Sequence, residues 1–134
     1  YIDNYDIVIA SRNMLESHIK VKQPLYRQLM GKIFPYLVSL ISVRGFKDTQ
    51  CGFKLFKTDA AKRIVSLQTF DRFSFDVEIL FIAKKLGYKI KEAPVTWVDK
   101  EGSKVKPVKD SIKMLRDLFK IRYNNLIGKY RVRR

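Results

Sequence analysis

A continuous β-branched run near the start of the chain, from Asp6 to Ala10, indicates the fold class more firmly than any other segment. Such runs are typical of strands that are buried in the sheet of an α/β protein. The run ends at Ser11 and Arg12, two polar residues at the position where the carboxyl end of a parallel strand opens onto a ligand-binding crevice. We therefore expect Arg12 to border a binding site, although an ordinary surface arginine fits the same pattern.

The rest of the chain alternates between short strand-like runs and longer helical stripes. Period-2 alternation predicts strands near residues 51–56 and 89–98, and Pro94 marks the second of these as an edge strand. In the first, we expect Cys51, Phe53 and Leu55 to form the apolar side of a half-buried strand. Apolar residues at spacings of three and four predict helices near residues 24–43, 59–67, 74–86 and 107–123, which would flank one small sheet.

Composition limits the possible functions. The chain has 134 residues, 46% hydrophobic content and a net charge of +15, which suits one domain that meets a polyanion: nucleic acid, a phosphorylated substrate or an anionic membrane surface. One cysteine and one histidine exclude an internal disulfide and a Cys/His metal site, so we expect Cys51 to be buried and His18 to be exposed in a loop. Because the chain begins at Tyr1 and enters a strand almost at once, we expect it to be part of a longer protein.

The predicted helix at 24–43 carries an apolar stripe with two possible roles. The run from Ile33 to Val43 is too short to cross a bilayer, which needs about 20 residues. The stripe would therefore pack against the sheet, which is the commoner arrangement, or lie in a membrane interface. Its members are Leu25, Leu29, Ile33, Tyr36, Leu37 and Leu40, and residues 13–23 before it are expected to form a mobile loop.

The predicted C-terminal helix combines two stripes. A basic stripe beside an apolar one suits a helix on an anionic membrane, and it equally suits a basic surface helix that packs on a sheet. The tail 129–134 adds a polybasic end. The basic stripe comprises Lys106, Lys109, Lys113, Arg116 and Lys120, and the apolar stripe comprises Val108, Ile112, Leu115 and Phe119.

Asp48 opens a turn that leads through Gly52 into the predicted strand at 51–56. A carboxylate just before a rigid element is held in place while it reaches a ligand, so we interpret this turn as the floor of an active site. An Asp-Thr pair that only caps its own turn is the alternative.

Three segments resemble the C-terminal half of family 2 glycosyltransferases, and among these the dolichyl-phosphate β-glucosyltransferases. They occur in the same order and at similar spacing as in that family. They are Asp48-Thr49-Gln50-Cys51-Gly52-Phe53-Lys54-Leu55-Phe56, then Arg72-Phe73-Ser74-Phe75-Asp76-Val77-Glu78, and then Glu92-Ala93-Pro94-Val95-Thr96-Trp97 with Gly102-Ser103-Lys104.

The resemblance implies that residues 1–134 form the acceptor side of a GT-A-type α/β domain whose nucleotide-binding half is absent. It implies transfer of a sugar, glucose above all, from a nucleotide-diphosphate sugar to dolichyl or polyprenyl phosphate. The reaction would take place at the cytoplasmic face of a membrane, that of the endoplasmic reticulum in a eukaryote. Mg²⁺ or Mn²⁺ would be held by an Asp-x-Asp motif in the missing half, so the fragment alone would be inactive.

The resemblance also implies roles for particular residues. Asp48 would be the catalytic carboxylate, which orients the acceptor or stabilises positive charge at the anomeric carbon. Arg12 and Arg27 would face the acceptor phosphate. Asp76 and Glu78 lie two apart on a predicted helix, so they point about 200° away from each other and cannot form an acid/base couple. We expect at least one of them to be solvated or to pair with Arg72. The remaining assignments are a phosphate loop of Lys100, Ser103 and Lys104, and pocket-shaping roles for Gln50, Gly52, Arg72, Asp76 and Glu78.

A non-enzymatic basic module that binds nucleic acid or an anionic membrane is the alternative class of function. Against nucleic acid, the chain lacks helix-turn-helix spacing, zinc ligands and a paired aromatic RNA-binding signature. We therefore expect the enzyme.

Overall fold

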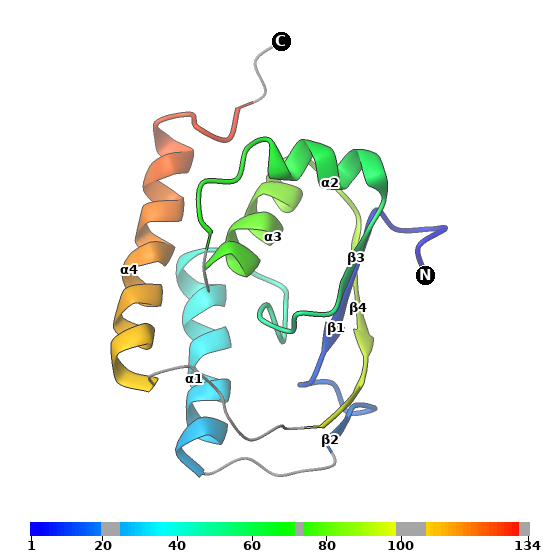
Figure 1. Ribbon diagram of the computed structural model, residues 1–134, viewed down its shortest axis with the longest axis vertical. Helices are drawn as coiled ribbons and strands as arrows, with labels where there is room; N and C mark the ends of the chain where they lie inside the picture. Colours follow the sequence, from blue (N-terminus) through cyan, green and yellow to red (C-terminus); the bar gives the residue numbers. More distant parts are fainter. Residues whose placement is uncertain (20–24, 72–73, 99–106, 132–134) are drawn as a thin grey trace.

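A computed structural model describes the chain except for residues 20–24, 72–73, 99–106 and 132–134; for residues 19, 26–28, 30–32 and 107–109 it describes only the backbone. Figure 1 shows a small sheet on one side of the molecule, with the helices packed on the other. The helices are α1 (Leu25–Ile41), α2 (Thr58–Val65), α3 (Phe75–Lys85) and α4 (Pro107–Leu126). The predicted α/β class with flanking helices is confirmed.

The sheet is built around β1 (Ile7–Ser11), the strand predicted from the β-branched run. It pairs antiparallel with β3 (Lys54–Phe56) and parallel with β4 (Ile90–Pro94). Ile7 and Ile9 are fully buried against the helices, as a central strand requires. Pro94 lies at the end of β4, which has a partner on one side only among the described strands, so the edge-strand prediction is confirmed.

The core is centred on α3, which is buried around most of its circumference rather than along the one stripe that its spacing predicted. Seven consecutive residues of α3 are buried, including Val77, Leu80 and Phe81. Gly87 follows the helix with a φ of 79°, a left-handed conformation that glycine adopts without strain and that ends the helix where the sequence predicted. The buried α3 residues form one core cluster with side chains of β1, α1, α2 and α4.

The segment at 51–56 was predicted to turn Cys51, Phe53 and Leu55 toward the core. This prediction is wrong for Phe53 and Leu55. Phe53 and Leu55 are exposed, whereas the Lys54 side chain is only 4% exposed and Phe56 packs against the core. The register explains this reversal: Lys54 and Phe56 pair with Ile9 and Ile7, whose side chains face the helices. Leu55 pairs with Val8 and so points to the other face of the sheet.

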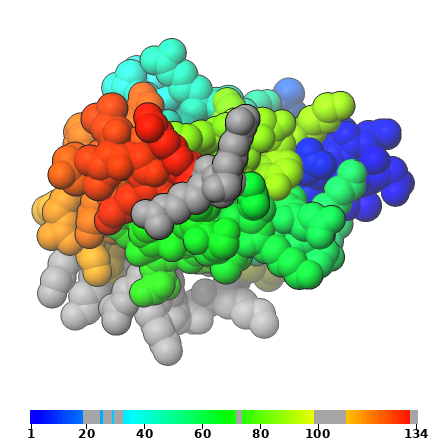
Figure 2. Space-filling model, turned by 90° about the horizontal axis from the view of Figure 1, so that it is seen from above, coloured from blue at the N-terminus to red at the C-terminus, as the bar shows by residue number. Residues whose placement is uncertain are grey.

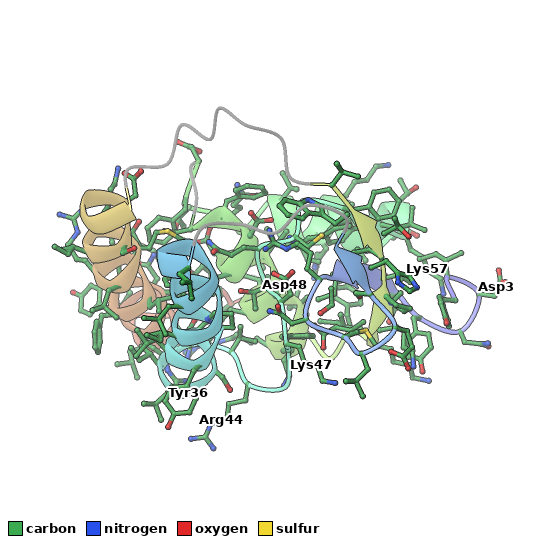
Figure 3. All side chains as sticks on the ribbon, turned by 90° about the horizontal axis from the view of Figure 1, so that it is seen from below. Asp3, Tyr36, Arg44, Lys47, Asp48 and Lys57 are labelled. Carbon is green, nitrogen blue, oxygen red and sulfur yellow. The ribbon has the colours of Figure 1, made fainter. Side chains whose placement is uncertain are left out.

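The apolar stripe on α1 does not pack against the sheet, which was the commoner of its two predicted roles. Leu29, Ile33 and Leu40 are exposed, and Figure 3 shows Tyr36 pointing away from the body of the protein. The helix instead buries its opposite side, because Val38 is fully buried and Phe34 and Ile41 pack against the core. The interface interpretation of this stripe therefore remains.

Helix α4 runs beside α1, and the predicted apolar stripe of α4 is likewise mostly outside the core. Ile112 and Phe119 are exposed, whereas Leu118 and Ile121 are the residues that α4 buries. Figure 2 shows the end of α4 next to the segment that ends α1, and the Arg122 Nε donates a hydrogen bond to the Ile41 carbonyl across this contact (2.7 Å). Two outward apolar stripes thus lie on neighbouring helices.

The predicted loop at 13–23 contains a short strand. β2 (His18–Ile19) pairs parallel with β5 (Thr96–Trp97), and His18 is exposed as expected. The Ser17 hydroxyl reinforces this pairing, since it donates to the Ser11 carbonyl (2.5 Å) and accepts from the Val95 N–H (3.2 Å). The segment after β1 is therefore tied to the strand that carries Trp97.

No helix within the described residues is long and apolar enough to cross a membrane.

Candidate functional site

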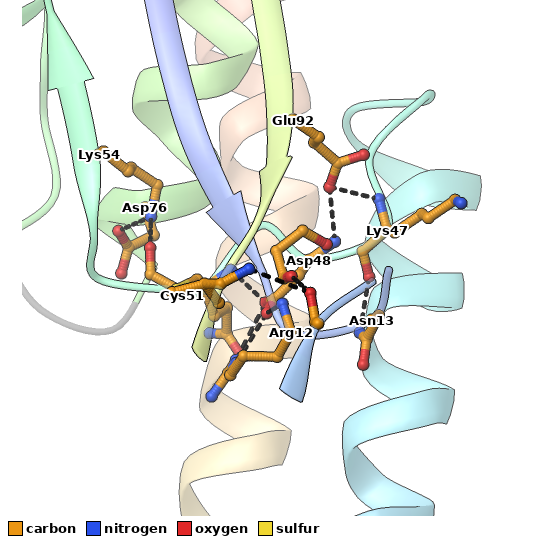
Figure 4. A network of polar contacts seen from close by, with 12 residues as sticks. Arg12, Asn13, Lys47, Asp48, Cys51, Lys54, Asp76 and Glu92 are labelled. Carbon is orange, nitrogen blue, oxygen red and sulfur yellow. Dashed lines mark hydrogen bonds and ion pairs between the residues drawn. The ribbon is translucent and has the colours of Figure 1, made fainter. Parts of the chain in front are cut away.

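The two residues predicted to stand closest to the chemistry, Arg12 and Asp48, form a bidentate ion pair. The Arg12 Nε donates to Asp48 Oδ2 (2.7 Å) and the Arg12 Nη2 donates to Oδ1 (3.0 Å). The backbone N–H of Arg12 also donates to Oδ2 (3.0 Å), and the backbone N–H of Gln50 donates to Oδ1 (3.2 Å). Figure 4 shows this pair where β1 ends. All four acceptor positions of the carboxylate are therefore taken.

The ion pair keeps both side chains charged. Burial raises the pKa of Asp48, but the hydrogen bonds and the charge of Arg12 outweigh it, and the pKa stays below the ordinary aspartate value. The hydrogen bond to Asp48 raises the pKa of Arg12, against the opposing effect of burial. An ionised carboxylate with a low pKa is a weak general base near neutral pH.

A second carboxylate, Glu92 of β4, fixes the backbone that carries Asp48. Glu92 Oε1 accepts from the backbone N–H groups of Lys47 (2.9 Å) and Asp48 (3.0 Å). On the other side of the turn, Asn13 Nδ2 donates to the Lys47 carbonyl (2.8 Å). The position of Asp48 is thus set by β1, β4 and the segment after β1 together, and not by the capping of its own turn alone.

Trp97 of β5 completes the surroundings of Arg12. The guanidinium carbon of Arg12 lies 5.4 Å from the centroid of a Trp97 ring, within the range of a cation–π contact. The Arg12 side chain remains 29% exposed. The Arg12 guanidinium is therefore held by a carboxylate and contacts an aromatic ring, while part of the Arg12 side chain stays accessible.

A second buried ion pair lies beside the first. Lys54 Nζ donates to Asp76 Oδ1 (2.5 Å) and to the Cys51 carbonyl (2.6 Å), which joins β3 to the start of α3. Burial raises the pKa of Asp76 above its ordinary value, and the lysine only partly offsets this. Cys51 itself is a buried free cysteine, as the sequence predicted.

Glu78 belongs to another part of the molecule. Its fully buried carboxylate accepts hydrogen bonds from the backbone N–H groups of Thr69 and Phe70, and from the hydroxyls of Thr69 and Tyr130. Burial, and then the hydrogen bond to Glu78, raise the pKa of Tyr130. Asp76 and Glu78 do point apart, as their spacing predicted, but neither is merely solvated: Glu78 is fully buried, and the Asp76 side chain is 13% exposed and pairs with Lys54. These contacts give no support to a pocket-shaping role for Glu78.

The structure describes the other predicted site residues to different extents. Gln50 lies next to the ion pair, since its backbone binds Asp48 and its side chain reaches Met114 Sδ (3.9 Å); Gly52 is exposed in the same turn. Arg27 is on α1, but its side chain is not among those described. Arg72, Lys100, Ser103 and Lys104 lie outside the described residues.

Sequence reasoning missed Glu92, Lys54 and Trp97 as site residues. One signal was available: Glu92 lies two residues after Ile90 and therefore shares its inward face of the strand, where a carboxylate needs a partner. Within the described residues, no group of three or more His, Cys, Asp or Glu side chains is arranged to hold a metal ion.

Comparison with known proteins supports the predicted resemblance. The chain is 39% identical over 128 residues to a dolichyl-phosphate β-glucosyltransferase of Dictyostelium discoideum, covering 95% of this chain and 39% of the relative. The proteins of the same name from Homo sapiens (40% identical, 94% of this chain, 39% of the relative) and Saccharomyces cerevisiae (39% identical, 93% and 38%) are similar over almost the same extent. No family model and no solved structure matches the chain.

These matches confirm the resemblance to dolichyl-phosphate β-glucosyltransferases, and they show that the chain spans about two fifths of the length of the curated relatives.

Proposed function

We propose that the whole protein transfers glucose from a nucleotide-diphosphate sugar to dolichyl or another polyprenyl phosphate, and that this chain supplies the acceptor side of the site. The observation that carries the proposal is the similarity of about 95% of the chain to proteins of this one name. The bidentate pair of Arg12 and Asp48 supports it, because both residues fall in the matched region and place a fixed cation at the end of a sheet strand. The nucleotide-binding half would lie in the part of the relatives that the chain does not cover.

The chemistry requires little from a general base. An oxygen of the lipid phosphate forms the new bond to the anomeric carbon, while the bond from that carbon to the nucleotide diphosphate breaks and the diphosphate leaves with the electron pair. A phosphate monoester is already ionised near neutral pH, since its second pKa is about 6. Catalysis would therefore depend on positioning and on neutralising two anions that repel each other. Arg12, whose charge is balanced by Asp48, would donate hydrogen bonds to the acceptor phosphate.

Further cations and a metal ion complete the proposal. Arg27 and the Lys100, Ser103 and Lys104 loop would add contacts to the phosphates. A Mg²⁺ or Mn²⁺ ion would stabilise the leaving diphosphate when bound. Its ligands would lie in the nucleotide-binding half of the protein. Within the residues that the structure describes, no group of three or more His, Cys, Asp or Glu side chains is arranged to hold an ion.

We place the acceptor beside a membrane surface formed by α1 and α4. This apolar face consists of exposed side chains on both helices. Phe119 and Leu126 lie one helical turn on either side of Arg122, which contacts α1, so the stripe on α4 borders α1. The members of the face are Leu25, Leu29, Ile33, Tyr36 and Leu40 on α1, and Ile112, Phe119, Tyr123 and Leu126 on α4.

Basic residues on α4 border the apolar face and favour an anionic membrane as its partner. Lys113, Arg116 and Lys120 are exposed along one side of α4. Each cation near an anionic leaflet contributes about 1 kcal/mol, and the apolar side chains add the free energy of transfer from water. With a net charge of +15, the chain would be attracted to the cytoplasmic leaflet, that of the endoplasmic reticulum in a eukaryote.

Charged substitutions on the α1 stripe test this membrane face. In the protein expressed at full length, Leu29→Asp combined with Leu40→Asp is expected to weaken binding to vesicles that contain phosphatidylserine by about tenfold or more, since burying one leucine is worth about 1.5–3 kcal/mol. Val65→Asp on α2 is the matched control, because Val65 is as exposed (63%) as Leu29 (60%) and Leu40 (56%). Co-sedimentation measures the binding, and equal losses in the variant and the control would contradict the face.

The activity is tested with the full-length protein, nucleoside-diphosphate glucose or mannose, and a polyprenyl phosphate. We expect a lipid-linked glucosyl phosphate from the glucose donor and little product from mannose. A nucleic-acid duplex of equal charge is the second binding partner in the assay. Absence of transfer from every donor, together with tight duplex binding and no preference for the lipid, would favour the non-enzymatic basic module instead.

A further inference from the structure

Asp48 has no unoccupied position at which to meet a substrate. A carboxylate offers about four acceptor positions, and here the Arg12 side chain takes two while the backbone N–H groups of Arg12 and Gln50 take the others. Asp48 is also only 1% exposed. A residue that accepts a proton or touches the anomeric carbon needs at least one accessible oxygen, so these contacts argue against the catalytic role that the resemblance implied for Asp48.

Arg12, in contrast, retains binding capacity. A guanidinium has five N–H groups in a fixed plane, and Asp48 accepts from two of them, on Nε and Nη2. The other three have no acceptor among the residues that the structure describes. Because the Arg12 side chain is 29% exposed and the Asp48 side chain only 2%, Arg12 is the member of the pair that an anion can reach. An arginine fork matches the geometry of a phosphate better than a lysine does.

The orientation of that fork is set by two residues on other elements. Asp48 holds the edge of the guanidinium, and the Trp97 ring lies against it at 5.4 Å. Asp48 is in turn fixed by Glu92 of β4, the strand that precedes β5 and Trp97. A long, flexible side chain held in this way loses little further entropy when it binds a ligand.

We infer that Asp48 and Trp97 are positioning residues, which hold Arg12 as a preformed fork for the phosphate of the acceptor. The inference rests on the proposed function, because it needs a phosphate at Arg12. In this inference Asp48 does not contact the substrate, and its whole effect on the reaction depends on Arg12. It also gives Trp97, which no comparison assigns a role, a part in acceptor recognition.

A double-mutant cycle on the full-length protein tests the dependence on Arg12. The measured quantity is the Kd of a short-chain polyprenyl phosphate, with the corresponding polyprenol as a neutral ligand. Asp48→Asn is expected to raise the Kd of the phosphate about tenfold, as the fork loses its charged anchor, and to leave the Kd of the polyprenol unchanged. In the Arg12→Ala background, the same substitution is expected to change the Kd of the phosphate less than about twofold.

Trp97 provides a second variant in case Asp48→Asn does not fold. Trp97→Leu is expected to raise the Kd of the phosphate about threefold, and Trp97→Phe, which keeps an aromatic face, to restore most of the affinity. Asp6→Asn is the matched control. Asp6, like Asp48, pairs with a basic side chain (Lys57) and accepts a backbone N–H, but it lies at the opposite end of β1. It is expected to leave the Kd unchanged.

The outcomes separate this inference from the proposed function. If Asp48→Asn costs as much in the Arg12→Ala background as in the wild type, Asp48 acts independently of Arg12 and the inference is overturned, while the glucosyltransferase proposal stands. If the wild-type protein does not prefer the phosphate to the polyprenol, acceptor recognition at this site is wrong, and the proposed function falls together with the inference.

Discussion

Replacement of Glu78 by glutamine is expected to lower the free energy of unfolding by about 2–4 kcal/mol. The substitution replaces one carboxylate oxygen, which accepts hydrogen bonds, by an NH₂ group, which can only donate them. Thr69 donates to Glu78 through its backbone N–H and its hydroxyl (2.6 Å), and Phe70 donates through its backbone N–H (2.9 Å). A glutamine amide would turn its NH₂ group toward some of these donors. At least one buried N–H or O–H group would then lose its acceptor, and water cannot replace it in a fully buried position.

Tyr130→Phe is the matched control for Glu78→Gln. It removes one hydrogen bond to the same carboxylate (2.7 Å) and keeps the ring that packs near Phe81, so it is expected to cost about 1 kcal/mol. Urea unfolding of the full-length protein, followed by far-UV circular dichroism, measures both variants. If Glu78→Gln lowers the free energy of unfolding no more than Tyr130→Phe does, the Glu78 carboxylate does not stabilise the fold beyond its one hydrogen bond to Tyr130.

The order and type of the main elements could be predicted because each has a strong local signal. The β-branched run at 6–10 became the central strand, and α3 ends at Lys85, one residue before the predicted boundary, with Gly87 in a left-handed conformation after it. The inward side of β3 could not be predicted in the same way. It depends on the pairing of Lys54 with Ile9, and no alternation within β3 reveals which face its neighbour buries.

The site was predictable in its residues but not in its connections. Both Arg12 and Asp48 were expected near the acceptor, yet the ion pair between them joins positions 36 residues apart, and local sequence patterns do not show such pairings. The pairing matters, because it changes Asp48 from a residue that meets the substrate to one that holds another residue. The exposed stripe on α1 shows the same limit: helical spacing predicts an apolar face, but not whether protein or a membrane covers it.

Replacement of the buried Lys54 is expected to lower the free energy of unfolding about as much as Glu78→Gln does. The size of this loss should depend on pH. Lys54 donates to Asp76 and to the Cys51 carbonyl, so Lys54→Met leaves a buried carboxylate without its cation. Breaking a buried pair by removing one partner typically costs about 3–5 kcal/mol. Because Cys51 lies three residues after Asp48, the substitution is also expected to loosen the turn that carries the Arg12 ion pair.

The pH dependence follows from the pKa of Asp76. Burial already raises this pKa in the folded protein, and without Lys54 it would rise further above the unfolded value. Such a carboxyl group destabilises the fold while it is ionised, and the penalty shrinks as pH falls through the folded pKa. The stability deficit of Lys54→Met relative to the wild type is therefore expected to narrow as the pH falls from neutral toward acidic values. Lys54→Met combined with Asp76→Asn should recover most of the lost stability at neutral pH. Urea unfolding at several pH values measures the deficit. A deficit that stays constant with pH, or that persists in the double variant, would mean that lost packing of the lysine stem, and not the unpaired charge of Asp76, causes the destabilisation.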